Sequence, residues 1–299
     1  DGGIGIIDCN QNNENPVLKY VQFKKPKTID FIILSHPHYD HFSGMLDLIK
    51  FCHSNNIEIK SFLQTSQFIT SDFIKAALKT VSSKKMWITL MRYINDTYLA
   101  QNTKVGLIQA DGLGCKIPIG KFSSLTFLSP TYSDMLKYIR QEKYNFDEED
   151  SHNSPLANIL STICRIETKD GYILLTADSS IYQLDRLPNT MDGKLVLGQS
   201  PHHGSGYNHA SNFWHKINRV SKTPIVFSVG SNKYGHPGRK AVESFIKNDY
   251  RIYSTNNEGW ISNIDNTPKR SEIMSTFGQK RANSIISDFS GDKIFTFQI

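Results

Sequence analysis

The stretch Phe31–His41 reads FIILSHPHYDH, in which three histidines and one aspartate fall within six residues. Its apolar first half is typical of a short buried strand, and the apolar spacing after it is typical of a helix. Because side chains two residues apart in an extended chain point the same way, His36 and His38 can face one metal ion. Asp40 and His41 follow where the chain turns and can face a second ion, since imidazole and carboxylate groups bind zinc, manganese and iron. The stretch therefore predicts a metal site at the end of a strand.

Two later segments repeat this pattern of an apolar strand followed by candidate ligands. Leu174–Asp178 is an apolar run that ends in a carboxylate, and Asp178 could bridge two metal ions. A strand-end aspartate alone is more often a cap or turn residue, but the histidine string elsewhere in the chain favours the bridging role. His202 and His203 follow another apolar strand and precede a glycine turn. This pair can supply one metal ligand, and its other histidine can support that ligand or contact the substrate.

A fourth strand-and-loop segment, Ser228–Pro237, contains His236. Six of the ten histidines lie in the three histidine-bearing loops described so far. Because active sites are commonly built from loops on a rigid scaffold, we predict that these loops share one site. The alternative for His236 is a turn histidine that packs on Tyr234 and Pro237. Two basic residues flank this histidine and could neutralise phosphate charge, although each alone is more often ordinary surface: Lys233 and Arg239.

The rest of the chain alternates between short apolar runs and amphipathic stretches, which indicates an α/β fold with sheet-on-sheet packing flanked by helices. We expect a single domain over residues 1–299. Further strands are expected near 58–63, 105–109, 123–128, 158–167, 172–177, 194–199, 224–229, 250–254 and 259–264. Helices are expected near 42–53, 69–80, 131–142, 181–187, 210–219 and 238–247.

Composition narrows the class of protein. No apolar run approaches the ~18 residues of a membrane span. The four cysteines are scattered without a C-x-x-C pair, which argues against a cysteine zinc site and favours free thiols in a reducing cytoplasm. The net charge of +6 and the pI near 9.0 permit attraction to polyanions, including nucleic acid.

Taken together, the motifs resemble those of the metallo-β-lactamase superfamily. Within it they resemble the branch that contains the extramembrane domain of DNA-uptake proteins of the ComEC type. That branch shows SHxHxDH, an Asn-x-x-Ser strand, L-L-T-G-D, PHHGS, a G-x-N-x-Y-G-H-P loop and a Y-x-T-x-x-x-G strand. The corresponding segments, in the same order, are Ser35–His41, Asn158–Ser161, Leu174–Asp178, Pro201–Ser205, Gly230–Pro237 and Tyr253–Gly259.

Three features depart from the family pattern. Ala177 stands where the family has glycine before the aspartate. The opening strand of the family is not found, so we expect that the domain here begins at its second strand, over residues 3–8. Many members supply a third histidine to the first metal, whereas this branch has an asparagine, here Asn158, with His152 just upstream as the other candidate.

The resemblance implies a metallo-β-lactamase αββα sandwich, two packed mixed sheets flanked by helices, with two divalent metal ions, zinc or alternatively manganese. It implies catalytic roles for Asp40, Asp178 and His236. The implied metal ligands are His36, His38, Asp40, His41, Asp178, His202 and His203, with the choice between the last two left open. The implied substrate contacts are Asn158, Ser161, Ser205, Lys233 and His236, the last touching a phosphate oxygen or protonating the leaving group.

Three functions follow as hypotheses. The first is a cytoplasmic two-metal phosphodiesterase, a nuclease with DNA or RNA as its substrate. The second is a hydrolase of a small ester, cyclic nucleotide or lactam, because one fold supports many chemistries. The third is a metal-stabilised effector or recognition module of a larger defence or uptake protein, with fused or associated domains. The third is disfavoured by the bridging carboxylate, which a closed structural metal site does not need.

Overall fold

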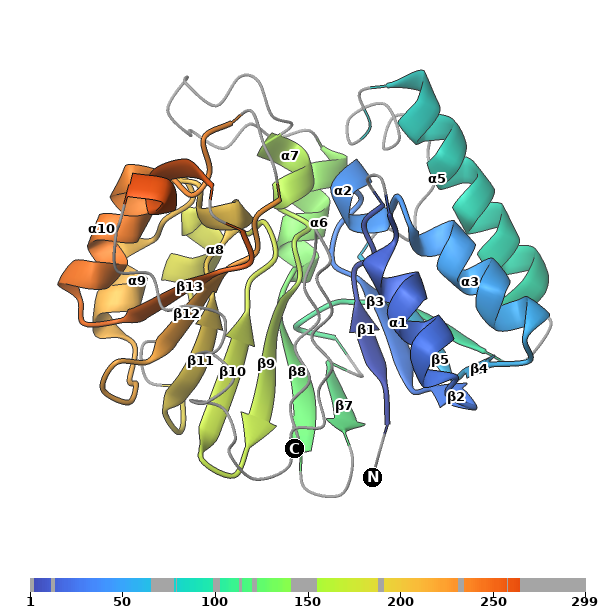
Figure 1. Ribbon diagram of the computed structural model, residues 1–299, viewed down its shortest axis with the longest axis horizontal. Coiled ribbons are helices and arrows are strands. Elements are labelled where there is room, and N and C mark those ends of the chain that lie inside the picture. Colours follow the sequence, from blue (N-terminus) through green and yellow to red (C-terminus); the bar gives the residue numbers. More distant parts are fainter. Residues whose placement is uncertain are drawn as a thin grey trace. The chain divides into compact units, whose positions relative to one another are not determined.

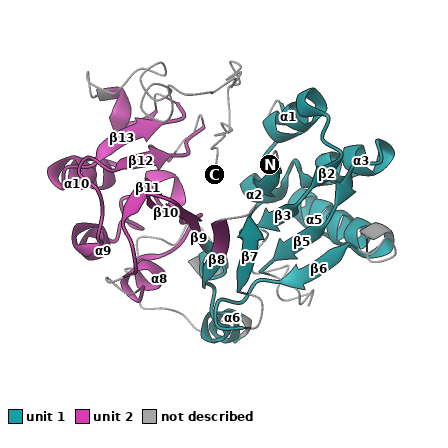
Figure 2. Cartoon of the chain, turned by 90° about the horizontal axis from the view of Figure 1, so that it is seen from below, with its two compact units in different colours: residues 1–120, 126–163 teal, residues 121–125, 164–299 magenta. Residues whose placement is uncertain are grey.

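The structure is a computed structural model. It describes residues 3–11, 14–65, 78, 80–98, 103–112, 115–119, 123–140, 155–187, 191–230, 234–256 and 258–263 (Figure 1). His152, Lys233 and nearly all of the helix expected near 69–80 lie outside these residues. The chain divides into two compact units (Figure 2): unit 1 is residues 1–120 and 126–163, and unit 2 is residues 121–125 and 164–299. The expectation of a single domain stays a prediction.

Unit 1 is built on a parallel sheet with the strand order β1-β3-β5-β6. A short parallel pair, β2-β4, accompanies it. Three helices, α1, α3 and α5, lie on one side of this sheet (Figure 2). The bounds of the strands are β1 Gly5–Ile7, β2 Thr28–Ile29, β3 Phe31–Leu34, β4 Glu58–Ile59, β5 Ser61–Gln64, β6 Lys104–Leu107 and β7 Lys116–Ile119. Those of the helices are α1 Pro16–Lys24, α2 Tyr39–Phe42, α3 Met45–Ser54, α5 Val81–Tyr93, the π-helix η1 Ile94–Tyr98, α6 Tyr132–Ile139 and α7 Pro155–Asn158.

The core of unit 1 explains why β3 reads as an unbroken apolar run. All four residues of β3 are buried, as expected for a parallel strand covered on both faces. Helix side chains meet this sheet: Phe42, Met45 and Trp87 are fully buried in the same cluster as Ile32 and Leu34. The rings of Phe42 and Trp87 pack edge to face, with centroids 5.1 Å apart. This packing fixes the end of β3, where the histidine string begins.

Unit 2 contains five strands of a second sheet, in the order β13-β12-β11-β10-β9. β9 and β10 form an antiparallel hairpin, and β10 to β13 run parallel to one another. Helices α8, α9 and α10 lie on one face of the sheet (Figure 2). The bounds are β9 Ile163–Thr168, β10 Gly171–Leu175, α8 Ile181–Asp185, β11 Leu195–Gln199, η3 His202–Gly204, α9 Ser211–Lys216, β12 Pro224–Phe227, α10 Arg239–Lys247, β13 Arg251–Ser254 and η4 Gly259–Asn263. Strand β8, Ser123–Ser129, is divided between the two units.

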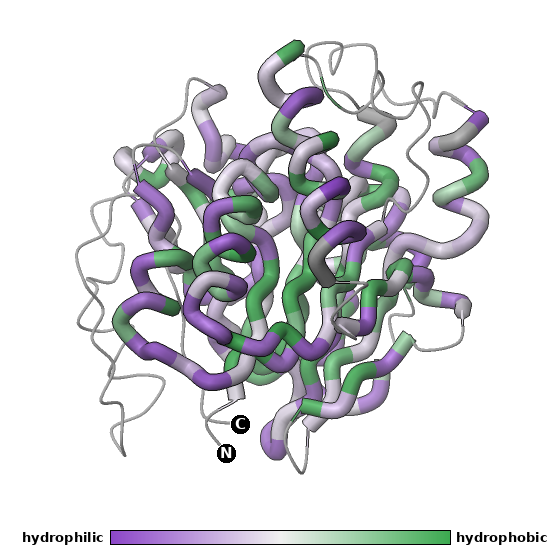
Figure 3. Tube along the Cα trace, turned by 90° about the vertical axis from the view of Figure 1, so that its right-hand side faces the viewer, coloured by the Kyte–Doolittle hydropathy of each residue, from purple (hydrophilic) through white to green (hydrophobic). Residues whose placement is uncertain are grey.

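Parallel strands position the candidate residues of unit 2. Because β10, β11 and β12 run in the same direction, the loops after them leave from the same edge of the sheet. These loops carry Asp178, the His202–His203 pair and His236. The strands carry hydrophobic runs, whereas the helices alternate between hydrophobic and hydrophilic residues (Figure 3). In the described part of the chain, no helix combines the length and apolar character needed to cross a membrane.

Two sequence expectations about strands are wrong. The strand expected from residue 158 begins at Ile163, and Asn158 instead ends helix α7. The strand expected over 259–264 is the 3-10 helix η4. Gly259 has a φ of 57°, and the N–H of Trp260 donates to the carbonyl of Pro237, so a turn contact replaces a strand ladder there.

Candidate metal centre

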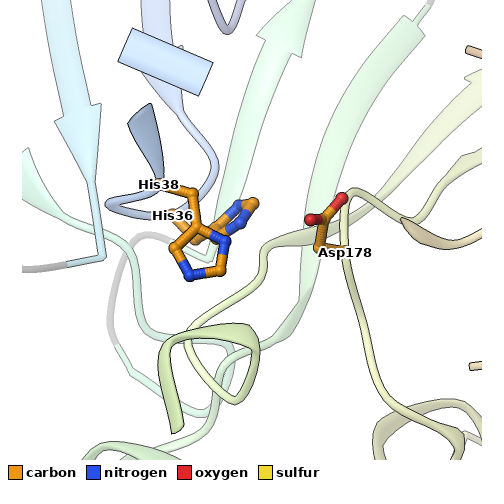
Figure 4. A group of neighbouring side chains, drawn as sticks. All are labelled: His36, His38 and Asp178. Atoms are coloured by element: carbon orange, nitrogen blue, oxygen red, sulfur yellow. The ribbon is translucent and has the colours of Figure 1, made fainter. Parts of the chain in front are cut away.

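The first group of candidate ligands lies in the loop and short helix that follow β3. Figure 4 shows the imidazoles of His36 and His38 in this loop. His36 is fully buried, and its ring centroid lies 4.6 Å from that of His38 and 4.0 Å from that of His41. His38 has an extended backbone and caps helix α2, which carries Asp40 and His41. The structure therefore brings the three imidazoles of the string together within unit 1.

Asp8, which the sequence reasoning missed, organises this group. It directly follows β1, and one of its oxygens lies 2.7 Å from Nδ1 of His41. The same carboxylate accepts hydrogen bonds from the N–H of Ser35, at 2.8 Å, and from its hydroxyl, at 2.6 Å. The Ser35 oxygen lies 3.1 Å from Nδ1 of His36. These contacts favour a proton on Nδ1 of both histidines, which leaves each Nε2 with a lone pair for a metal ion.

The second group lies in unit 2, where two histidines face one carboxylate. Asp178 follows β10 (Figure 4) and is only 2% exposed. Its two oxygens lie 3.6 Å from Nε2 of His202 and 3.8 Å from Nε2 of His203. Both distances are longer than a hydrogen bond. Nδ1 of His202 lies 3.0 Å from the side-chain oxygen of Asn208, and Nδ1 of His203 lies 2.7 Å from the carbonyl of Ser228.

These contacts decide which nitrogen of each histidine is available. Both Nδ1 atoms face oxygens that can only accept, so Nδ1 carries the proton and Nε2 presents its lone pair. Two imidazole lone pairs turned toward a buried carboxylate repel it unless a cation lies among them. Nitrogen and carboxylate oxygen are the donors that zinc and manganese take. The donor set of unit 2 therefore fits a divalent metal ion.

Unusual backbone conformations accompany this donor set. Ala177, His202 and His203 have φ values of 44°, 47° and 53°, a left-handed region that non-glycine residues rarely adopt. Each such residue costs about 1–3 kcal/mol, and such residues cluster at functional sites. The N–H of His202 donates to the carbonyl of Ala177, at 2.9 Å, which ties the histidine turn to the Asp178 turn. Ala177 occupies the position where the family pattern has glycine.

His236 lies beside the histidine pair of unit 2. Its ring centroid is 5.7 Å from that of His202, and its ring stacks on Tyr234 with centroids 6.1 Å apart. Burial lowers the pKa of His236 to about 4, and the neighbouring His202 and His203 act in the same direction, while Asp178 opposes them. At neutral pH the imidazole is therefore uncharged. It can donate one hydrogen bond to a phosphate oxygen, and its expected roles toward substrate stay predictions.

The other expected substrate contacts are placed as follows. Asn158 and Ser161 are buried in unit 1, and the N–H of the adjoining Thr162 donates to the carbonyl of Ser35 at 3.0 Å, which places this segment beside the histidine loop. Ser205 is buried in unit 2, and its N–H donates to the carbonyl of His202 at 2.8 Å. Their contacts with substrate stay predictions.

Comparison with known proteins bears on the fold. Residues 6–97 match the family model of the Beta-lactamase superfamily domain, a segment that includes Asp8 and the whole histidine string. No curated protein sequence matches the chain. Among solved structures, the chain is similar to the metallo-beta-lactamase fold protein YhfI from Bacillus subtilis, at 17% identity and a TM-score of 0.44, with 85% of each chain covered. It is also similar to Tm1679, a metal-dependent hydrolase of the beta-lactamase superfamily, at 12% identity and a TM-score of 0.41, with 85% of this chain and 94% of that chain covered.

The predicted α/β fold class is confirmed. A parallel sheet in unit 1, a mixed sheet in unit 2 and the helices on them are consistent with the metallo-β-lactamase fold.

Proposed function

We propose that the chain is a metal-dependent hydrolase that cleaves phosphodiester bonds in DNA or RNA with two divalent metal ions. The observation that carries the proposal is the convergence of two imidazole Nε2 atoms on the buried carboxylate of Asp178, with both Nδ1 atoms held by oxygen acceptors. Metal-binding histidines characteristically have their second nitrogen held in this way.

The proposed ligands fall into two sets. By the resemblance of the motifs, His36 and His38 would hold one ion, and Asp40 and His41 would hold the other with one histidine of the His202–His203 pair. Asp178 would contribute to both. When bound, the two ions supply Lewis-acid chemistry, which activates water and stabilises charge on phosphate oxygens.

The chain's own groups position these ligands and the substrate. Asp8 and Ser35 fix the tautomers of His41 and His36, and Asn208 does the same for His202. Neutral His236 donates a hydrogen bond to a non-bridging phosphate oxygen, a role that its lowered pKa permits at neutral pH.

Three observations favour a phosphodiester over other hydrolysable bonds. Paired metal sites suit in-line displacement at phosphorus, because both the attacking and the leaving oxygen can be stabilised. The net charge of +6 attracts a polyanion. The order of the motifs resembles that of DNA-uptake domains of the ComEC type.

The test is a cleavage assay on the purified chain with Mn²⁺ or Zn²⁺. The panel holds single- and double-stranded DNA, RNA and bis(p-nitrophenyl) phosphate, and the His36→Ala/His38→Ala double variant is the control. We expect wild type to cleave a polymer and the double variant to be inactive. Cleavage of the small ester alone would move the substrate to a compact phosphodiester. If nothing is cleaved although metal is bound, the proposal is wrong and the metal is structural.

The contacts of Asn208 yield a prediction about metal affinity. Besides holding His202, its amide donates to the carbonyl of Ser179 at 3.2 Å, next to Asp178. Asn208→Ala is expected to weaken metal binding roughly 10- to 100-fold, the usual effect of losing such a supporting group. Competition with a chelator measures the affinity. Asn218→Ala is the matched control, because that amide donates to the Gly193 carbonyl at an exposed position. Equal affinities for wild type and Asn208→Ala would contradict the assigned role.

A further inference from the structure

Three segments of unit 2 are joined by backbone hydrogen bonds and form a structural support beside His236. The N–H of Gly238 donates to the carbonyl of Gly204 at 2.9 Å, and the N–H of Trp260 donates to the carbonyl of Pro237 at 2.8 Å. The fit is close: a Cβ atom added to Gly259 would lie 2.4 Å from the carbonyl carbon of His236. The loops after β11 and β12 and helix η4 are therefore held together by backbone contacts.

This support presents aromatic rings to solvent. Tyr207 is 57% exposed and Tyr234 is 58% exposed, although large aromatic side chains usually bury most of their surface. Trp260 is half-buried, and the guanidinium of Arg239 lies 4.9 Å from the centre of its ring. Arg239 also binds Glu243, at 2.7 Å, which orients its planar group.

The exposed ring of Tyr234 belongs to a row of three aromatic rings that begins at the candidate metal ligand His202. His202 meets His236 edge-on, with 60° between the ring planes, whereas Tyr234 lies nearly parallel to His236, with 25° between the planes. A flat group laid on Tyr234 would extend this series outward from the site. Nucleobases are flat, and stacking on aromatic side chains is the usual way in which proteins bind unpaired bases without reading their sequence. Positive charge for the phosphates is near, on Arg239 and Lys240 at the start of α10.

We propose that Tyr207, Tyr234 and the Trp260–Arg239 pair form a stacking platform that binds the unpaired bases of a single-stranded nucleic acid beside the candidate metal centre. This inference rests on the proposed function, because it names the form of that substrate. A base in a duplex is stacked on its neighbours and cannot also lie on Tyr234, so the platform selects single strands or frayed ends.

The test separates base contacts from phosphate contacts. Two labelled single strands of equal length, one with bases and one made of abasic sites, are titrated with the full chain in EDTA, and binding is followed by fluorescence anisotropy. Wild type is expected to prefer the strand with bases. Tyr234→Ala should weaken binding of that strand roughly 5- to 150-fold, the range for losing one base–aromatic stack. It should leave binding of the abasic strand unchanged, and Tyr234→Phe should restore the preference.

Tyr132→Ala is the matched control, because Tyr132 is similarly exposed, at 55%, but lies at the start of α6 in unit 1. Equal affinity of wild type for the two strands, or no binding of either strand, would overturn the platform. A parallel assay of bis(p-nitrophenyl) phosphate hydrolysis keeps the two proposals distinct. Ester cleavage without base preference leaves the hydrolase standing and removes the platform. Base preference without cleavage of any phosphodiester leaves the platform standing and removes the proposed hydrolase function.

Discussion

Asp178→Asn is expected to lower phosphodiester hydrolysis by about a thousandfold or more, which corresponds to roughly 4 kcal/mol of lost transition-state stabilisation. The asparagine keeps the shape of the side chain but removes the negative charge that two histidine Nε2 atoms face at 3.6 and 3.8 Å. Without that charge, the histidines lose the partner with which they would share a cation. Metal content, measured by elemental analysis after dialysis, should fall together with activity.

The stability of the metal-free variant makes this result specific. Asp178 is almost completely buried, and an unneutralised carboxylate in that position is unfavourable. In EDTA, Asp178→Asn should therefore be at least as stable as wild type in thermal unfolding. A variant that is inactive only because it is misfolded would show the opposite.

The matched control is Asp170→Asn, an exposed aspartate that precedes β10, at the other end of the strand that Asp178 follows. It should keep wild-type activity and metal content. Full activity in Asp178→Asn, with normal metal content, would show that the carboxylate neither binds nor bridges an ion.

The parts of the site that could be predicted share a simple local cause. An apolar run indicates a buried strand, and a strand in a sheet places the residues that follow it at one edge of that sheet. This reasoning located the His36–His41 string after β3 and Asp178 after β10, and it needed no knowledge of distant contacts. The residues that position these candidate ligands lack such a signal. Asp8 meets His41 only because β1 pairs with β3, and it stands 33 residues away in the sequence.

Helices were harder to predict where the local pattern was weak. The helix α5 has apolar side chains at helical spacing, at Trp87, Leu90 and Met91, but polar residues dominate its first turns. Its start is set by a capping box between Thr80 and Ser83, which uses serine in place of the usual acidic or amide residue. A helix was expected to end where this one begins. For η4, the apolar residues favoured a strand, and a backbone contact to Pro237 overrode that preference.

His209 is expected to make the stability of the protein depend on pH. It is buried beside Phe245, and its Nε2 lies 2.7 Å from the hydroxyl of Ser244. Burial lowers the pKa of His209 to about 4 from the ordinary value of 6.5, and the charge of Lys240 adds to the effect. Between these two values the unfolded chain binds a proton that the folded chain does not. The free energy of unfolding therefore falls as the pH falls from about 6.5 to 4, and it is not reduced by this residue above 6.5.

The decrease in the free energy of unfolding that His209 causes should reach roughly 3 kcal/mol at the acid end of this range, since one pKa unit corresponds to about 1.4 kcal/mol. Urea unfolding in EDTA, followed at several pH values, measures it, and the comparison is with His209→Gln. The glutamine variant loses packing and is less stable at pH 7, but its stability should decline less steeply on acidification. Because every other titrating group, including His236, is present in both proteins, the difference between the two slopes belongs to His209.

His215→Gln, which removes an exposed histidine, controls for the loss of a histidine as such. Parallel curves for wild type and His209→Gln would mean that the buried ring takes up its proton without opposing the fold, and the pKa of His209 would then lie near its ordinary value.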